Sequence, residues 1–213
     1  MSDEERLLHT LDLCFTAGTW GELLAYLLYV PLFVLLGVSF LHFVMWDVLS
    51  LMVYWLDFFV VWLPIATASH IIQQPRPNAR DDGGACAGTS TYLGTTAMPD
   101  PWQTTLVVYV ALWTTLAVMY RQKRLALPLT SLWVLAVLFE ASMVYNRYTT
   151  WTQLVVSLAL VPPITAMLAW LIDSFLLDEA QVLSSTTVGR WFGLMSNVHR
   201  MRNPNAAVAS LPK

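Results

Sequence analysis

The chain contains five long apolar runs, each bounded by charged residues or by turn-forming segments. A membrane-spanning helix needs about 20 mainly apolar residues, because each residue advances the helix by about 1.5 Å. Inside lipid the backbone must satisfy its own hydrogen bonds, and runs of this length are too continuous for barrel strands. We therefore predict an all-α, polytopic membrane helix bundle with spans at Leu23–Trp46, Val48–Ile72, Thr104–Tyr120, Leu125–Tyr145 and Leu154–Ile172.

The composition excludes most other classes of protein. Apolar residues make up 57% of the chain and charged residues 12%, whereas an average soluble domain carries about 25% charged residues. With 11 Lys and Arg against 14 Asp and Glu, the chain has no basic excess with which to bind nucleic acid. Two cysteines are too few for a disulfide framework or a cysteine-based zinc site.

The segments that flank the apolar runs predict helices lying on the membrane surface. In residues 1–22, an acidic segment, Leu7, Leu8, Leu11 and Phe15 have helical spacing, and the alternative is a frayed tail. In residues 173–213, an apolar stripe runs beside three arginines, which is typical of a basic amphipathic helix. Its members are Val188, Trp191, Phe192, Met195 and Val198, beside Arg190, Arg200 and Arg202. We expect this tail to follow a single membrane domain, residues 23–172.

The distribution of basic residues predicts the orientation of the bundle. Seven Lys or Arg residues lie on the side of the Arg121 turn and the C-terminus, against four on the other side. The positive-inside rule therefore favours a cytoplasmic C-terminus. The loop Gln73–Gln103 and the turn Asn146–Thr152 then share the lumenal or external side. Cys14 and Cys86 share it too, either as a disulfide or as two unrelated thiols.

Three short motifs lie at membrane boundaries on this predicted lumenal side. They are His70–Pro77 (HIIQQPRP), Met98–Gln103 (MPDPWQ) and Ser142–Gln153 (SMVYNRYTTWTQ). In order and spacing they resemble the phosphatidic acid phosphatase type 2 superfamily, and within it the dolichyl-diphosphate phosphatases of the endoplasmic reticulum. The first family motif is a Lys, six intervening residues and then Arg-Pro, and the second is a Pro-Ser-Ser-His or Pro-Ser-Gly-His turn. The third is a Ser-Arg pair, five intervening residues, a His and then Thr-Trp-Ser-Gln. The resemblance extends from about Leu24 to Gln153 and implies a phosphatidic acid phosphatase type 2-like fold.

The resemblance also implies a division of catalytic work that this chain lacks. In the family one histidine attacks phosphorus, a second protonates the leaving group, and Lys and Arg hold the phosphate oxygens, without a metal or other cofactor. Arg76 and Gln153 match the family. The departures are Ser69 at the Lys position, Trp102 at the general-acid His, Met143 at the third-motif Arg and Thr149 at the nucleophile, with Asp100 and Pro101 in place of the second-motif serines.

These replacements predict a pseudoenzyme. Loss of a nucleophile or its partner costs about 10⁴ to 10⁶ in rate, and the remaining residues do not compensate. An unassisted Thr hydroxyl is a poor nucleophile, and the Trp indole has no useful acidity. We therefore expect a silent structural, regulatory or lipid-binding subunit in the endoplasmic reticulum membrane, with membrane lipids, a polyprenyl phosphate and other membrane proteins as partners. The alternative is an active dolichyl-diphosphate phosphatase with a displaced catalytic set.

Several residues could form such a displaced catalytic set, but each of them could also have a purely structural role. His70 adjoins the lost Lys position but points about 100° away on a helix, which favours a structural role. Arg147 lies four residues after Met143 and shares its face if the fourth span continues that far; it then binds phosphate with Arg76, or it faces lipid headgroups. A metal site built from Asp81, Asp82 and Asp100 competes with ordinary turn chemistry, and we expect no metal.

Two carboxyl groups, those of Asp57 and Glu140, fall inside predicted spans. Ionised side chains are costly there and usually face a partner or a cavity. They indicate either a proton or substrate path, as in a transporter, or polar contacts between helices or subunits.

Overall fold

A computed structural model describes residues 5–8, 13–16, 19–31, 33–34, 37, 48–74 and 99–187. Most of these residues are helical. Four of the helices are long and apolar enough to cross a membrane: Leu49–Ile72, Pro101–Met119, Lys123–Tyr145 and Trp151–Ser185. They confirm the second to fourth predicted spans and the start of the fifth, as expected for an integral membrane protein. Half of the first predicted span, Leu23–Trp46, lies outside the described residues.

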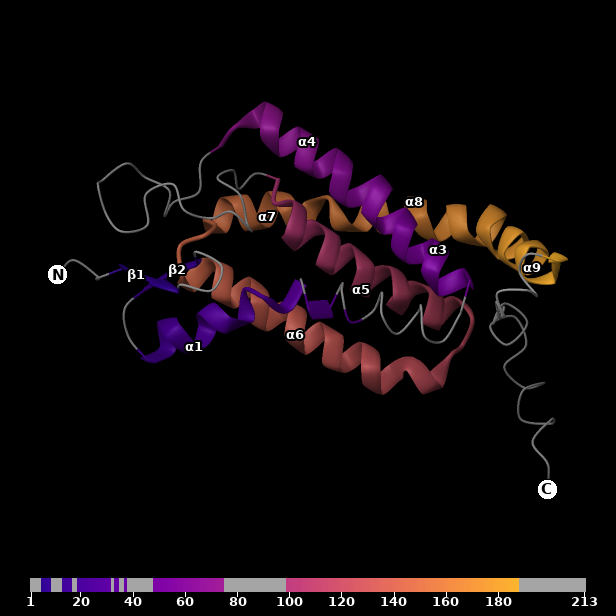
Figure 1. Cartoon of the computed structure of the whole chain (residues 1–213), viewed down its shortest axis with the longest axis horizontal. Coiled ribbons are helices and arrows are strands. Elements are labelled where there is room, and N and C mark those ends of the chain that lie inside the picture. Colours follow the sequence, from indigo (N-terminus) through magenta and orange to yellow (C-terminus); the bar gives the residue numbers. More distant parts are fainter. Residues whose placement is uncertain are drawn as a thin grey trace, which may run out of the picture.

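The four long helices run side by side in alternating directions (Figure 1). The first consists of α3 (Val48–Asp57), a π-helical turn η1 (Phe58–Trp62) and α4 (Leu63–Ile72). It is followed by α5 (Pro101–Met119), a short 3-10 turn η3 (Lys123–Leu125) and α6 (Ala126–Tyr145). The last long helix consists of α7 (Trp151–Ala159), α8 (Val161–Leu171), a π-helical turn η4 (Ile172–Leu176) and α9 (Leu177–Ser185).

Helix α5 is the centre of the bundle. It packs against α3, η1, α4, α6, α7 and α8, and 61% of its apolar window is buried, against 28 to 33% for the other three candidate spans. A helix that is apolar on every side is typical of such a central position. The two buried clusters lie on its opposite sides, one against α3, η1 and α8, the other against α6 and against Leu28 and Tyr29, which follow α1 (Thr19–Leu27).

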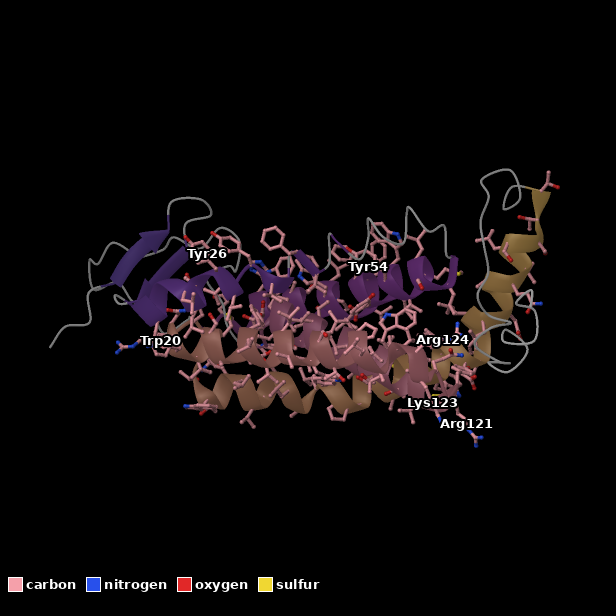
Figure 2. The ribbon with its side chains drawn as sticks, turned by 90° about the horizontal axis from the view of Figure 1, so that it is seen from below. Trp20, Tyr26, Tyr54, Arg121, Lys123 and Arg124 are labelled. Atoms are coloured by element: carbon pink, nitrogen blue, oxygen red, sulfur yellow. The ribbon has the colours of Figure 1, made fainter. Side chains whose placement is uncertain are left out.

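The alternating directions create two distinct ends of the bundle. We call one the site end: it contains Ser69–Gln74, Pro99–Gln103 and Met143–Gln153, and α1 lies beside it (Figure 1). We call the other the basic end: it contains the turn Tyr120–Leu125. Figure 2 shows Trp20 and Tyr26 near the first end and Arg121, Lys123 and Arg124 gathered at the other.

The N-terminal prediction of an interfacial helix within residues 1–22 is wrong where the structure describes it. Strands β1 (Glu5–Leu8) and β2 (Leu13–Thr16) pair antiparallel, with Glu5 opposite Thr16 and Leu8 opposite Leu13. Short apolar runs do not distinguish a helix from a hairpin by periodicity alone. Helix α1 also begins at Thr19, before the predicted boundary, and ends at Leu27, four residues before Pro31, whose ring clashes with a helical carbonyl at that position.

The helix that contains the fifth predicted span does not end at Asp173. It continues through η4 and α9 to Ser185. Its 35 residues extend about 52 Å, well beyond the roughly 30 Å of a hydrocarbon core, so Asp173 need not lie in lipid. The predicted basic amphipathic helix, from Val188 onward, lies outside the described residues.

Candidate functional site

The positions that correspond to the family motifs lie at the site end. Ser69 is buried on the last turn of α4, and Trp102 is on the first turn of α5. Met143 is on the last turn of α6, Thr149 is in the turn that follows, and Gln153 is on the first turn of α7. Arg76 lies outside the described residues.

Apolar side chains fill the space around the Trp102 and Met143 positions. Trp102 packs against a cluster that includes Met143, Phe139 and Tyr148, each of which is 0% exposed. Its ring also lies edge-on to Trp62, with centroids 5.8 Å apart. Tyr148, a residue of the third motif, is the largest fully buried side chain of the described part. This packing is suited to holding helices together rather than to binding a charged headgroup.

Thr149 has little opportunity to act as a nucleophile. Its side chain is buried, and its hydroxyl donates to the carbonyl of Thr150 at 3.4 Å. A peptide carbonyl is too weak a base to activate an alcohol. His70, the single histidine in the described part of the chain, is exposed, whereas its neighbour Ser69 is buried. The two side chains therefore point in different directions, as the helix geometry predicts.

Arg147 was expected to share the helix face of Met143 only if the fourth span continued as a helix to residue 147, and it does not. Helix α6 ends at Tyr145, Asn146 caps it, and Arg147 adopts a left-handed conformation with φ of 58°. The side chain of Arg147 is exposed while that of Met143 is fully buried. The two residues therefore do not share a helix face, because the helix does not extend that far.

Asp100 occupies the N-terminus of α5 with its own carboxylate. Its Oδ1 accepts hydrogen bonds from the backbone N–H groups of Trp102 and Gln103, both at 2.9 Å. Its backbone N–H donates to Ser157 Oγ of α7 at 3.1 Å. A helix N-terminus is where a phosphate is commonly held by free N–H groups. In this chain a buried carboxylate already occupies that position.

A polar contact between α5 and α6 lies one helical turn deeper. Gln103 Nε2 donates to Glu140 Oε2 at 2.7 Å. Among the described residues Gln103 Oε1 and Glu140 Oε1 have no hydrogen-bond partner, although both atoms are buried. The structure thus supports the second reading of Glu140, a polar contact between helices. Gln103 was missed from sequence, although a polar residue three positions after a helix cap on an apolar helix is a usable signal.

Asp57 is the other intramembrane carboxyl. It ends α3 and is 1% exposed, and its Oδ1 has no hydrogen-bond partner within the described ranges. No group of three or more metal-ligating residues occurs in those ranges. Asp81, Asp82 and Cys86 lie outside them. The metal site built from Asp81, Asp82 and Asp100 and the pairing of Cys14 with Cys86 therefore stay predictions.

The turn into α7 depends on a reciprocal capping box. Thr150 Oγ1 accepts from the backbone N–H of Gln153 at 3.3 Å, and Gln153 Oε1 accepts from the backbone N–H of Thr150 at 2.9 Å. Gln153 thus serves to start a helix.

We expect Thr150→Ala to lower the free energy of unfolding by about 1 kcal/mol, the usual value of a lost N-cap. Thr150→Ser, which keeps the hydroxyl, should stay close to the wild type. Denaturation of the purified protein in mixed detergent micelles measures both. Equal losses in the two variants would show that the methyl group, and not the cap, stabilises this turn.

No protein-family model, curated protein or solved structure matches this chain.

Proposed function

We propose that this protein is a catalytically silent membrane protein with a dolichyl-diphosphate phosphatase-like frame, which acts as a structural, regulatory or lipid-binding subunit. In this proposal it resides in the endoplasmic reticulum membrane, with the site end lumenal and the C-terminus cytoplasmic. Its partners are membrane lipids, including a polyprenyl phosphate, and other subunits of a membrane complex.

The proposal rests mainly on one observation: the Asp100 carboxylate occupies the N-terminus of α5. Two N–H groups that could face a phosphate are bonded to the Asp100 carboxylate. A second carboxyl group, that of Glu140, lies one turn further on and contacts Gln103. A phosphate placed at this helix end would find these two N–H groups already bonded to a carboxylate oxygen and therefore not free to hold it.

The residues at the reactive positions support the same conclusion. Phosphoryl transfer requires the protein mainly to position the substrate and to supply positive charge. At these positions the chain supplies an indole, a thioether and a buried alcohol, from Trp102, Met143 and Thr149. The bonds that the frame still makes, such as the capping box of α7, maintain the backbone rather than the chemistry.

Phosphate release from dolichyl diphosphate tests the proposal. We expect the purified full-length protein to give no release above that of empty detergent micelles, with an active lipid phosphatase assayed in parallel as the positive control. The matched variant is Arg76→Ala, which removes the retained motif cation. Turnover that disappears in Arg76→Ala would overturn the proposal in favour of a displaced catalytic set.

A further inference from the structure

The basic end of the bundle contains a groove that the proposed function does not use. It lies between α5 and α6, has a volume of about 470 Å³, and is bordered at its mouth by Arg121 and Lys123. Below these cations its walls are mainly apolar, with Val118, Leu129 and Trp133 among the lining residues. A cationic mouth above an apolar channel matches the two chemical halves of an anionic lipid.

The turn between the two helices fixes the position of the cations. Gln122 N–H donates to the carbonyl of Ala117 at 2.8 Å, and Arg121 N–H donates to the carbonyl of Val118 at 3.2 Å. This pair of bonds is the Schellman arrangement, which usually places a glycine at the left-handed position. Here that position is Arg121, with φ of 53°. An L residue at such an angle costs about 1 kcal/mol, so the chain carries a cation where glycine would fold more easily.

The apolar wall of the groove is also fixed in place. Trp133 Nε1 donates to Thr114 Oγ1 at 3.0 Å, and Thr114 Oγ1 in turn donates to the carbonyl of Val110 at 2.8 Å. These bonds tie the indole of α6 to the backbone of α5. Leu129 is buried behind it, whereas Val118 is 72% exposed on the side open to lipid. A channel with a rigid wall and an open side can accept an acyl chain from the bilayer.

The charges around the groove favour an anion. Two of its lining residues are cations and none is a carboxylate. The carboxyl group of Asp173, at the start of η4, accepts a hydrogen bond from the hydroxyl of Tyr120 in the turn between α5 and α6. A second groove, of about 390 Å³, between α3, η1 and the last helix is lined only by apolar residues, with Trp55 and Phe59 among them. It lacks the polar half that would select a headgroup.

We propose that the groove at the basic end binds an anionic phospholipid, with the headgroup phosphate at Arg121 and Lys123 and one acyl chain between α5 and α6. Basic pockets between membrane-spanning helices commonly bind anionic headgroups in this way. Figure 2 shows both cations, with Arg124, projecting from the same end of the bundle. The site lies at the end of the molecule opposite the motif positions and does not depend on the proposed function.

Thermal unfolding of the purified full-length protein in detergent micelles tests this assignment, with three probes added in turn: phosphatidylglycerol, phosphatidylcholine and inorganic phosphate. A ligand that binds the native state raises the unfolding temperature, and the rise grows with the logarithm of its concentration relative to its Kd. We expect a concentration-dependent rise with phosphatidylglycerol and none with the other two. Because each basic residue near an anionic headgroup contributes about fivefold in affinity, Arg121→Gln with Lys123→Gln should weaken binding about 25-fold.

Two further variants make the test specific to the groove. Arg124→Gln removes the same charge from the same turn, but Arg124 does not line the groove, so binding should stay within about twofold of the wild type. Arg121→Gly relieves the left-handed strain and should fold at least as well as the wild type, yet bind about fivefold more weakly. Equal effects of phosphatidylglycerol and phosphatidylcholine, a rise with phosphate alone, or equal losses in Arg124→Gln and the double variant would each overturn the proposal.

Discussion

Replacing Gln103 by methionine should lower the free energy of unfolding by about 2 to 3 kcal/mol. Gln103 is fully buried and provides the hydrogen bond at 2.7 Å to Glu140 Oε2. Methionine matches the length of the side chain but leaves the carboxyl group of Glu140 without this donor. A single hydrogen bond between membrane helices is worth on average only about 0.6 kcal/mol. The larger loss comes from the buried polar group left behind, which costs about 1 to 3 kcal/mol.

The partner substitutions separate these two contributions. Glu140→Gln should cost less than about 1 kcal/mol, because a second amide can also donate to Gln103 Oε1, which has no partner among the described residues. The double variant Gln103→Met with Glu140→Met removes both polar groups and should be more stable than Gln103→Met alone. Unfolding by sodium dodecyl sulfate in mixed micelles measures the wild type, Glu140→Gln, the double variant and its two single variants, Gln103→Met and Glu140→Met. A double variant whose loss equals the sum of the losses in Gln103→Met and Glu140→Met would contradict a direct interaction.

Replacing Asp100 by alanine should lower the free energy of unfolding by about 2 to 4 kcal/mol. The substitution removes the N-cap of α5, worth up to about 2 kcal/mol, and it leaves two N–H groups without the acceptor that they have at 2.9 Å. Because Asp100 is 0% exposed, water does not readily replace the carboxylate, and each orphaned donor adds to the loss. Helix α5 packs against most of the bundle, so its fraying should lower the midpoint of the global transition.

Asp100→Asn is the matched control. Asparagine caps helices about as well as aspartate, so this variant should remain within about 1 kcal/mol of the wild type. Hydrogen exchange at the first turn of α5 checks the local effect, with faster exchange expected in Asp100→Ala only. If Asp100→Asn were as unstable as Asp100→Ala, the negative charge and not the cap would be what stabilises this end of the bundle.

Much of the helical frame was predictable because a bilayer imposes a length and an apolar composition on every span. The second, third and fourth spans were predicted to within three residues at each end. Asp100 was noted beside the start of α5, and the box formed by Thr150 and Gln153 lay within the third motif. The N-terminal hairpin was not predictable, because runs as short as Glu5–Leu8 fit a strand and a helix equally well.

The side-chain packing and hydrogen bonds of the candidate site were harder to predict from the sequence than the helices. The motif spacing placed Trp102, Met143 and Thr149 at one end of the bundle, but it did not reveal that Tyr148 and Phe139 pack around them. Arg147 does not share the face of Met143, because α6 ends at Tyr145, where the fourth span was predicted to end, and does not continue to Arg147. Asp100 contacts Ser157 of α7, and Glu140 of α6 contacts Gln103 of α5. These partners were not predictable, because the sequence pattern does not specify which helices pack against each other.

The amino-acid sequence by itself determined that the chain forms helices long and apolar enough to cross a membrane, since length and composition depend only on which residues follow one another. The tertiary structure decided how the polar groups are used. It brought the Gln103 amide to the Glu140 carboxyl, made Asp100 occupy its own helix N-terminus, and formed a groove beside Arg121 and Lys123. These features depend on distances of a few ångströms between separate helices, which are set by side-chain packing across the whole bundle.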